Sequence, residues 1–263
     1  MGVAALSSPI LICNPRDAWI GWKYPGDREL KRRKLLTCLD LSVSMALPPY
    51  NYLTTGKMIS LAMLSAQVRE DYSSKFRDHE TPTGLRENRL ALITTTSIYG
   101  SSVQYNRLRV NGRPAYVLVG YTEGYGNAHL TEKEFAEMET YLSAQGNPIP
   151  KGWGTGRSYR LRVYTAYYRH RYKLPHTSNH RQPRSVYVAP LGETAREFLL
   201  EETPYIRPYK YRMSDLIHLW KQEWLARKVV KREVMETFRK SNPRESMLTR
   251  QIEKLVEELA EGQ

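Results

Sequence analysis

Cysteine is scarce in this chain of 263 residues, which contains only Cys13 and Cys38. Two cysteines so far apart cannot build the disulfide framework of a small secreted domain. We therefore expect both to be buried free thiols in a cytoplasmic protein. A zinc site would need them to join scattered histidines, and His170, His176 and His180 have a spacing that fits no standard zinc motif. The sequence predicts no metal site.

Long apolar runs are also absent. No stretch approaches the roughly 18 residues that a membrane-spanning helix requires. The N-terminal residues, MGVAALSSPILIC, lack the basic start of a secretory signal peptide. Leu6 stands where a myristoylation motif needs Ser or Thr. We expect no membrane partner.

Clustered carboxylates are missing as well. Asp17, Asp40, Asp71, Asp78 and Glu123 are scattered and form no paired motif that would hold the metal ions of a nuclease. A metal-dependent nuclease is therefore the least favoured function class. The chain has 40 Lys and Arg against 27 Asp and Glu, a formal net charge of +13. Such a charge favours a polyanionic partner, most simply nucleic acid.

The strongest local charge bias lies between Lys151 and Gly192, a stretch without a single Asp or Glu. A merely solvated basic face would normally carry balancing acids. Basic residues mixed with tyrosines suit phosphate contact and base stacking, so we predict that this stretch binds nucleic acid, with DNA favoured over RNA. The residues predicted to make the contact are Arg157, Arg160, Arg162, Tyr167, Arg169, Arg171, Lys173, Arg181 and Arg184.

Apolar patterning predicts three buried strands, each short and closed by Gly or Pro. They are Leu39–Leu47, Leu90–Ile98 and Tyr116–Tyr121. Tyr159–Tyr168 alternates in part and is predicted as a further strand. Helical spacing and capping signals predict four helices. They run from Met58 to Phe76, from Thr131 to about Gly146, from Ser214 to about Lys240, and over about 244–260. The charged residues 27–34, DRELKRRK, are predicted as a further, solvated helix. This order favours an α/β (α+β) fold with a mixed central sheet flanked by helices.

Residues 146–157, GNPIPKGWGTGR, are rich in Gly and Pro and mark the clearest boundary in the chain. We therefore expect a core over residues 1–145 and a basic, aromatic strand and loop region over 146–212 that packs on it. Helices are expected over 213–263. The amphipathic pattern of the last of them could dock on the core or on a second copy of the chain.

Two polar loops are candidate sites. The first follows the strand Leu39–Leu47 and leads into a helix, an arrangement that places unpaired N–H groups and a positive dipole end at the loop. The residues that would suit a phosphate there are Asn51, Thr54, Thr55, Gly56 and Lys57. The first glycine of a P-loop is missing, and an ordinary capped helix is the alternative.

The second loop lies between the strands Leu90–Ile98 and Tyr116–Tyr121. It is dense in hydroxyls, amides and tyrosine, which is typical either of a site or of a satisfied polar turn. Its candidate catalytic residues are Tyr99, Ser101, Gln104, Tyr105 and Asn106.

Four blocks of sequence, in this order along the chain, resemble the family of the Druantia anti-phage protein DruA. They are RDAWIGW, ALPPYNYLTTGK, TTSIYGSSVQYNRL and VGYTEGYG, which lie within residues 9–130. The resemblance implies a role in defence against phage, or in mobile elements that carry defence genes, together with other subunits of such a system.

A more distant resemblance is to the GNAT acyltransferase fold, in which a strand, a loop and a helix hold the cofactor pyrophosphate and a tyrosine acts as the acid. It implies a CoA-like or nucleotide ligand at the loop before Lys57, with Tyr105 or Tyr99 as general acid. The Gln/Arg-x-x-Gly-x-Gly/Ala cofactor loop of that fold is absent, and only Gly56-Lys57 stands in its place.

Two functions follow and both stay open. One is an enzyme with a transferase-like activity on nucleic acid, with Ser101, Gln104 and Asn106 orienting the substrate. The other is a non-catalytic scaffold or sensor that recognises nucleic acid and recruits effector subunits.

Overall fold

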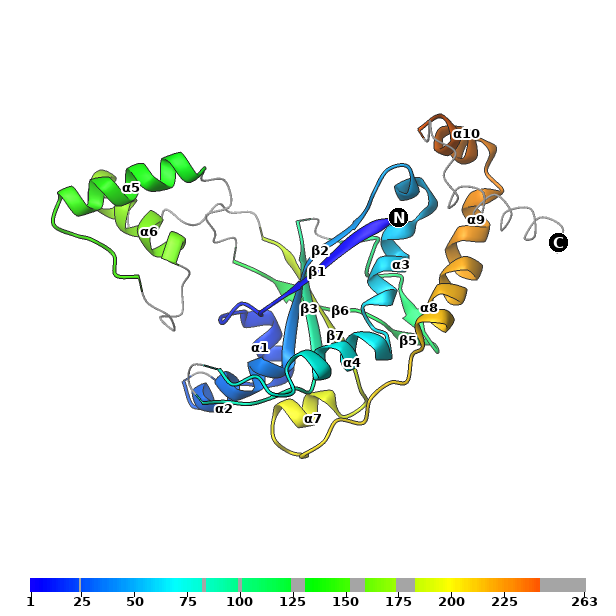
Figure 1. The fold of residues 1–263 in the computed structure, drawn as a ribbon, viewed down its shortest axis with the longest axis horizontal. Helices are drawn as coiled ribbons and strands as arrows, with labels where there is room; N and C mark the ends of the chain where they lie inside the picture. Colours follow the sequence, from blue (N-terminus) through cyan, green and yellow to red (C-terminus); the bar gives the residue numbers. More distant parts are fainter. Residues whose placement is uncertain are drawn as a thin grey trace.

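The computed structural model describes residues 1–23, 25–81, 84–98, 101–123, 131–151, 159–173 and 183–241. Its centre is a five-stranded sheet in the order β1-β2-β3-β7-β6 (Figure 1). Strands β2 and β3 are parallel, and the other neighbours are antiparallel. The strands are β1 (Gly2–Ser7), β2 (Cys38–Ala46), β3 (Leu92–Ser97), β6 (Val117–Tyr121) and β7 (Ser185–Pro190), with β4 (Arg109–Val110) and β5 (Arg113–Pro114) pairing separately.

Helices cover both faces of the sheet, so the fold is mixed α/β. One face of the sheet packs against α1 (Asn14–Ile20), α2 (Arg28–Lys34) and α7 (Ala195–Leu199). The opposite face packs against α3 (Thr55–Ala62) and α4 (Ala66–Lys75). The same apolar cluster includes α8 (Met213–Trp220), α9 (Ala226–Val229) and α10 (Arg232–Lys240), with α8 packed on α3 and α10 packed on residues 50–53. Successive side chains of a strand point to opposite faces of the sheet. Leu92 and Val188 therefore join the core on the first face, and their neighbours Ile93 and Tyr187 join the core on the second.

The strands predicted around β2, β3 and β6 are confirmed. The long helix predicted from Met58 to Phe76 is instead two helices, because the chain turns at residues 63–65 and the Ala66 amide donates to the Tyr211 carbonyl. The predicted C-terminal helix is likewise divided. A π-helical turn (Lys221–Leu225) follows α8, and a break at Val230 separates α9 from α10.

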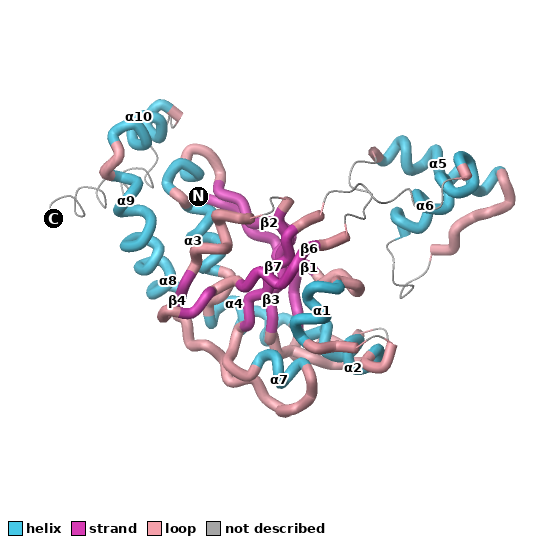
Figure 2. Tube along the Cα trace, turned by 180° about the vertical axis from the view of Figure 1, so that it is seen from behind, coloured by secondary structure: helices cyan, strands magenta, loops and turns pink. Residues whose placement is uncertain are grey.

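A pair of helices, α5 (Glu132–Ala144) and α6 (Tyr159–Tyr172), is inserted between the neighbouring strands β6 and β7. It has its own apolar cluster, built by α5, α6 and the segment between them. Figures 1 and 2 show the pair standing apart from the sheet. The strand predicted over Tyr159–Tyr168 is wrong: this segment is the start of α6, because its alternation coincides with a helical stripe, Tyr159, Val163 and Tyr167, that packs on α5.

The two inserted helices run in the same direction. Near their starts, Arg160 forms an ion pair with Glu132 at 2.8 Å. Near their ends, the Tyr141 hydroxyl lies 3.3 Å from Nδ1 of His170. The α5 helix begins with the predicted capping box, in which Thr131 and Glu134 bond to each other's backbone amides.

Candidate functional site

Strands β2 and β3 diverge, and this divergence places the candidate loops. Their pairing covers only Cys38–Asp40 against Leu92–Thr94. Beyond it, β2 continues to Ala46 beside β1, and β3 continues to Ser97 beside β7. The polar segment that follows β3 turns back between the diverging strands and bonds to both, as the contacts below show.

A surface hollow of about 320 Å³ lies where β2 ends and α3 begins. It brings together four of the five residues predicted to hold a cofactor, together with Gln104 from the second loop. Its lining residues are Ser44, Met45, Ala46, Asn51, Thr54, Gly56, Lys57, Val103 and Gln104. The two polar loops of the sequence therefore meet at one place, although 46 positions separate Lys57 from Val103.

The hydroxyls of the two threonines at the start of α3 donate to backbone carbonyls of the protein itself. The Thr54 hydroxyl donates to the Leu53 carbonyl at 2.6 Å, and the Thr55 hydroxyl donates to the Tyr50 carbonyl at 2.8 Å. Thr55 is fully buried and does not line the hollow. The Thr54 carbonyl accepts the indole N–H of Trp220 at 3.2 Å, which fixes the loop against α8.

Gln104 occupies the centre of a polar network between β2 and α3. Its amide nitrogen donates to the Oγ atoms of Ser44 and Ser60, both at 2.8 Å. A Cβ at Gly56 would lie 3.3 Å from Gln104 Oε1, so the close approach of loop and helix favours glycine there. This network orders the floor of the hollow.

Lys57 is buried beside the hollow, and its ammonium donates to the Val103 carbonyl. Burial and, second, the positive charge of Arg107 together lower the pKa of Lys57 to about 8. The ammonium also lies 5.8 Å from the centre of the Trp224 ring. A cation so poorly solvated would interact favourably with an anion placed in the hollow.

Replacing Lys57 by methionine should reduce the increase in the free energy of unfolding that the wild type shows above pH 8. The folded pKa of about 8 lies below the ordinary value of 10.5, so the unfolded chain holds more protons in that window. The free energy of unfolding of the wild type therefore rises as pH increases from about 8 to 10.5, and the variant lacks this contribution. Urea unfolding at pH 7 and pH 10 measures the difference. The exposed Lys75→Met variant is the control, and equal pH slopes for wild type and Lys57→Met would contradict the assignment.

Tyr105, predicted as a general acid, lies in the core with 6% of its surface exposed. Its ring packs between Tyr116 and Tyr187, with ring centres 4.9 and 5.1 Å away. Its hydroxyl lies 3.5 Å from the Thr95 Oγ, and Tyr105 does not line the hollow. The geometry gives Tyr105 a packing role between the diverging strands.

The other candidate catalytic residues are divided between surface and interior. Ser101 and Asn106 are exposed and bond to each other at 2.6 Å. Among the candidate residues that the structure describes, Gln104 alone lines the hollow. Tyr99 lies outside the described residues.

The positive charge at the start of α6 is partly balanced by acids from the neighbouring helix. The acids missing from residues 151–192 are supplied by α5, where Glu132 pairs with Arg160 and Glu139 accepts the Tyr159 hydroxyl. The Arg160 guanidinium also lies 4.9 Å from the centre of the Phe135 ring, and that of Arg162 lies 5.6 Å from the centre of Tyr159. These two predicted nucleic-acid contacts are thus also packing contacts of the helix pair.

The end of α6 presents its charges outward. Arg169, Arg171 and Lys173 are exposed, and Tyr172 is 53% exposed. Tyr167 is half-buried between the two helices, with its ring centre 5.1 Å from that of Tyr141. Arg184 belongs to the β6–β7 connection, where its backbone bonds to Thr122. Arg157 and Arg181 lie outside the described residues.

Sequence reasoning did not decide the role of Arg16 and Asp17, which the structure shows as a buried ion pair. The Arg16 guanidinium is fully buried and donates twice to Asp17 Oδ1, at 2.9 and 2.8 Å. It also donates to the carbonyls of Ile10 and Leu11 at 2.8 and 3.3 Å. Lys31 reaches the other Asp17 oxygen at 2.5 Å. The pair therefore holds the connection from β1 to α1.

The expected free thiols are confirmed. Cys13 and Cys38 are both buried and unpaired with each other, and burial raises the pKa of Cys38 to about 12. In the part of the chain that the structure describes, no three His, Cys, Asp or Glu side chains gather as a metal site would require. None of the described helices has the length and apolar character needed to cross a membrane.

These features define an α/β protein with a ligand-sized hollow at a strand–helix junction and an inserted, partly basic helix pair. The chain belongs to the Druantia protein DruA family, whose model matches residues 1–201. It is 30% identical over 203 residues to the Druantia protein DruA of Escherichia coli (strain UMEA 4076-1). That match covers 76% of this chain and 49% of the relative, so it spans about half the relative's length. No solved structure matches the chain significantly.

Proposed function

We propose that the chain is a nucleic-acid-binding component of the Druantia anti-phage system, and that it contacts nucleic acid at the C-terminal end of α6. One observation carries this proposal. Arg169, Arg171 and Lys173 are exposed together beside the exposed Tyr172, whereas Arg160 at the start of the same helix is paired with Glu132. Exposed cations next to an exposed ring suit phosphate contact with stacking. DNA is favoured over RNA, and other subunits of the system remain proposed partners.

Changing Arg169, Arg171 and Lys173 together to glutamine should weaken binding of a DNA 20-mer at least about tenfold at roughly 0.1 M salt. The slope of log affinity against log salt should fall by about 2–3, because each lost phosphate contact removes nearly one unit. Fluorescence anisotropy over a salt series measures both. The control changes the exposed Arg227, Lys231 and Arg232 to glutamine, which removes the same formal charge elsewhere. Equal losses of affinity in the two triple variants would show that binding depends on net charge alone, and would contradict the assignment of the binding surface to the end of α6.

A second candidate is a transferase-like activity at the hollow, as the GNAT resemblance implies. Its support is the meeting of Asn51, Gly56, Lys57 and Gln104 around one space after a strand, a loop and a helix start. The burial of Tyr105 instead favours the non-catalytic scaffold, since no acid from that residue reaches the hollow. Thermal unfolding with CoA and with ATP separates the two: a stabilisation that Lys57→Met removes supports the ligand site, and no shift with either supports the scaffold.

Association of two copies through the C-terminal helices also stays a proposal, and residues 242–263 lie outside the described residues.

A further inference from the structure

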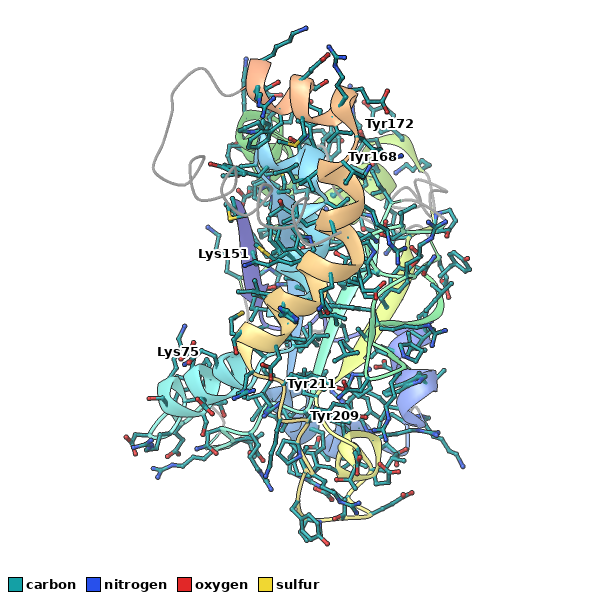
Figure 3. The ribbon with its side chains drawn as sticks, turned by 90° about the vertical axis from the view of Figure 1, so that its right-hand side faces the viewer. Lys75, Lys151, Tyr168, Tyr172, Tyr209 and Tyr211 are labelled. Carbon is teal, nitrogen blue, oxygen red and sulfur yellow. The ribbon has the colours of Figure 1, made fainter. Side chains whose placement is uncertain are left out.

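The surface next to the first turn of α8 combines arginines with stacked tyrosines. Tyr209 and Tyr211 lie side by side just before α8, where Figure 3 labels them. Their ring centres are 5.2 Å apart and the rings are inclined by only 16°. The guanidinium of Arg113, from β5, lies 5.7 Å from the centre of the Tyr209 ring. We name Arg113, Glu193, Arg207, Tyr209 and Tyr211 the Arg–Tyr surface.

One carboxylate is shared by the two arginines of this surface. Arg113 lies 3.2 Å from one Glu193 oxygen, and Arg207 lies 3.3 Å from the other. All three side chains are well exposed, at 58%, 66% and 42%. Exposed ion pairs are weak, so this arrangement can open at little cost. Two guanidinium groups that converge on two oxygens also present the geometry that a phosphodiester needs.

The backbone under the Arg–Tyr surface is firmly held. The Tyr209 amide donates to the Leu191 carbonyl at 3.0 Å, and the Tyr211 carbonyl accepts the Ala66 amide at 2.8 Å. The Tyr209 carbonyl accepts the Arg69 guanidinium at 2.6 Å. The backbone that carries the two tyrosines is therefore preorganised, which lowers the ordering cost of binding.

The charge around the Arg–Tyr surface is biased. The chain carries no Asp or Glu from residue 88 to residue 122, which includes Arg107, Arg109 and Arg113. Lys210, which stands between the two tyrosines in the sequence, adds a further exposed cation. As in the α6 stretch, an acid from elsewhere in the chain pairs with one of its arginines, here Glu193 with Arg113.

We infer that the Arg–Tyr surface binds single-stranded nucleic acid. A phosphodiester replaces Glu193 between Arg113 and Arg207, and an unpaired base stacks on the tyrosine pair beside them. Bases in a duplex are stacked on each other and cannot use this platform. The inference rests on the proposed nucleic-acid function but concerns a different surface, most of which lies outside the residues that the family model matches.

The test uses the full chain with a labelled single-stranded DNA 20-mer and the same sequence as a duplex. Changing Arg113 and Arg207 to glutamine should weaken single-strand binding about tenfold. Glu193→Gln should strengthen it severalfold, because the competing carboxylate charge is gone; a merely structural Glu193 predicts no gain. Tyr209→Leu should weaken single-strand binding but leave duplex binding unchanged. The control is Arg212→Gln, an exposed arginine that pairs with Asp215 outside the stack.

The outcomes separate this inference from the proposed function. If the triple variant at the end of α6 loses binding while the Arg–Tyr variants and Arg212→Gln all bind as the wild type does, the inference is wrong and the proposed function stands. If the Arg–Tyr variants alone lose single-strand binding, the inference stands and the α6 surface is wrong. Weaker binding by Glu193→Gln, or equal losses in Arg212→Gln and the double variant, would also overturn the inference.

Discussion

Replacing Arg16 by methionine should lower the free energy of unfolding by about 3–5 kcal/mol. The guanidinium is fully buried and makes two bonds to Asp17 and two to the backbone carbonyls of Ile10 and Leu11. Without it, the largely buried Asp17 carboxylate keeps Lys31 as its cationic partner, and both carbonyls lose a donor. Removing one partner of a buried ion pair is costly because the other charge stays desolvated. Urea unfolding followed by tryptophan fluorescence measures the loss.

The matched control is Arg32→Met. Arg32 is about half-exposed and lies 3.8 Å from Glu29, so its removal should cost less than about 0.5 kcal/mol. A loss of under 1 kcal/mol for Arg16→Met would show that water or neighbouring groups satisfy Asp17, and it would reject the structural role assigned to the pair.

Excising residues 123–183 and joining Thr122 to Arg184 through Asn-Gly should leave the sheet folded while weakening DNA binding about a hundredfold. The strands already meet there, because Tyr121 pairs with Ser185 and the Thr122 amide donates to the Arg184 carbonyl at 2.9 Å. An Asn-Gly turn suits two antiparallel strands at this point. The excised helices bury their apolar residues in a cluster of their own, so the two main cores lose none of the members found in the described part of the chain.

Thermal unfolding and anisotropy on the excised chain measure the two effects. The control is a chain of full length with Arg169, Arg171 and Lys173 changed to glutamine, which keeps the helices and loses the three exposed cations at the end of α6. Loss of cooperative unfolding after excision would show that α5 and α6 stabilise the sheet. Unchanged DNA binding would remove the helix pair from the binding function.

The sequence predicted strands β2, β3 and β6, the last of them at the edge of the sheet, because their apolar runs are unambiguous. It did not reveal β1, where GVAALS has little strand propensity, or β7, where SVYVAP follows a long basic stretch. It also assigned the start of α6 to a strand, since YRLRVYTAYY satisfies both periods over a short window. Only the neighbouring α5, which supplies both an apolar surface and the acids that α6 lacks, decides between them.

The candidate site was also predicted only in part, because tertiary packing decides which loop residues face the hollow. Loop chemistry identified Asn51, Gly56, Lys57 and Gln104, and the structure places all four around one hollow. Tyr105 has the same kind of side chain that a catalytic acid would have, but packing turns it into the core. Which way a loop residue faces depends on its tertiary neighbours, so the list of polar residues in a loop does not separate the two cases.

The common direction of α5 and α6 makes the inserted pair electrically polar. Both helix dipoles add, with their positive ends at the starts, where α5 carries Glu132 and Glu134, and their negative ends beside Arg169 and Arg171 of α6. At the ends, Arg169, Arg171 and Lys173 outweigh the partial negative charge of the dipoles, whereas at the starts Glu132 and Glu134 are offset by Lys133, Arg160 and Arg162. The side-chain charge of the pair is therefore most positive at the end of α6. A polyanion would therefore exert a torque on the pair as well as an attraction. The pair would meet a nucleic acid in a preferred orientation before any contact forms.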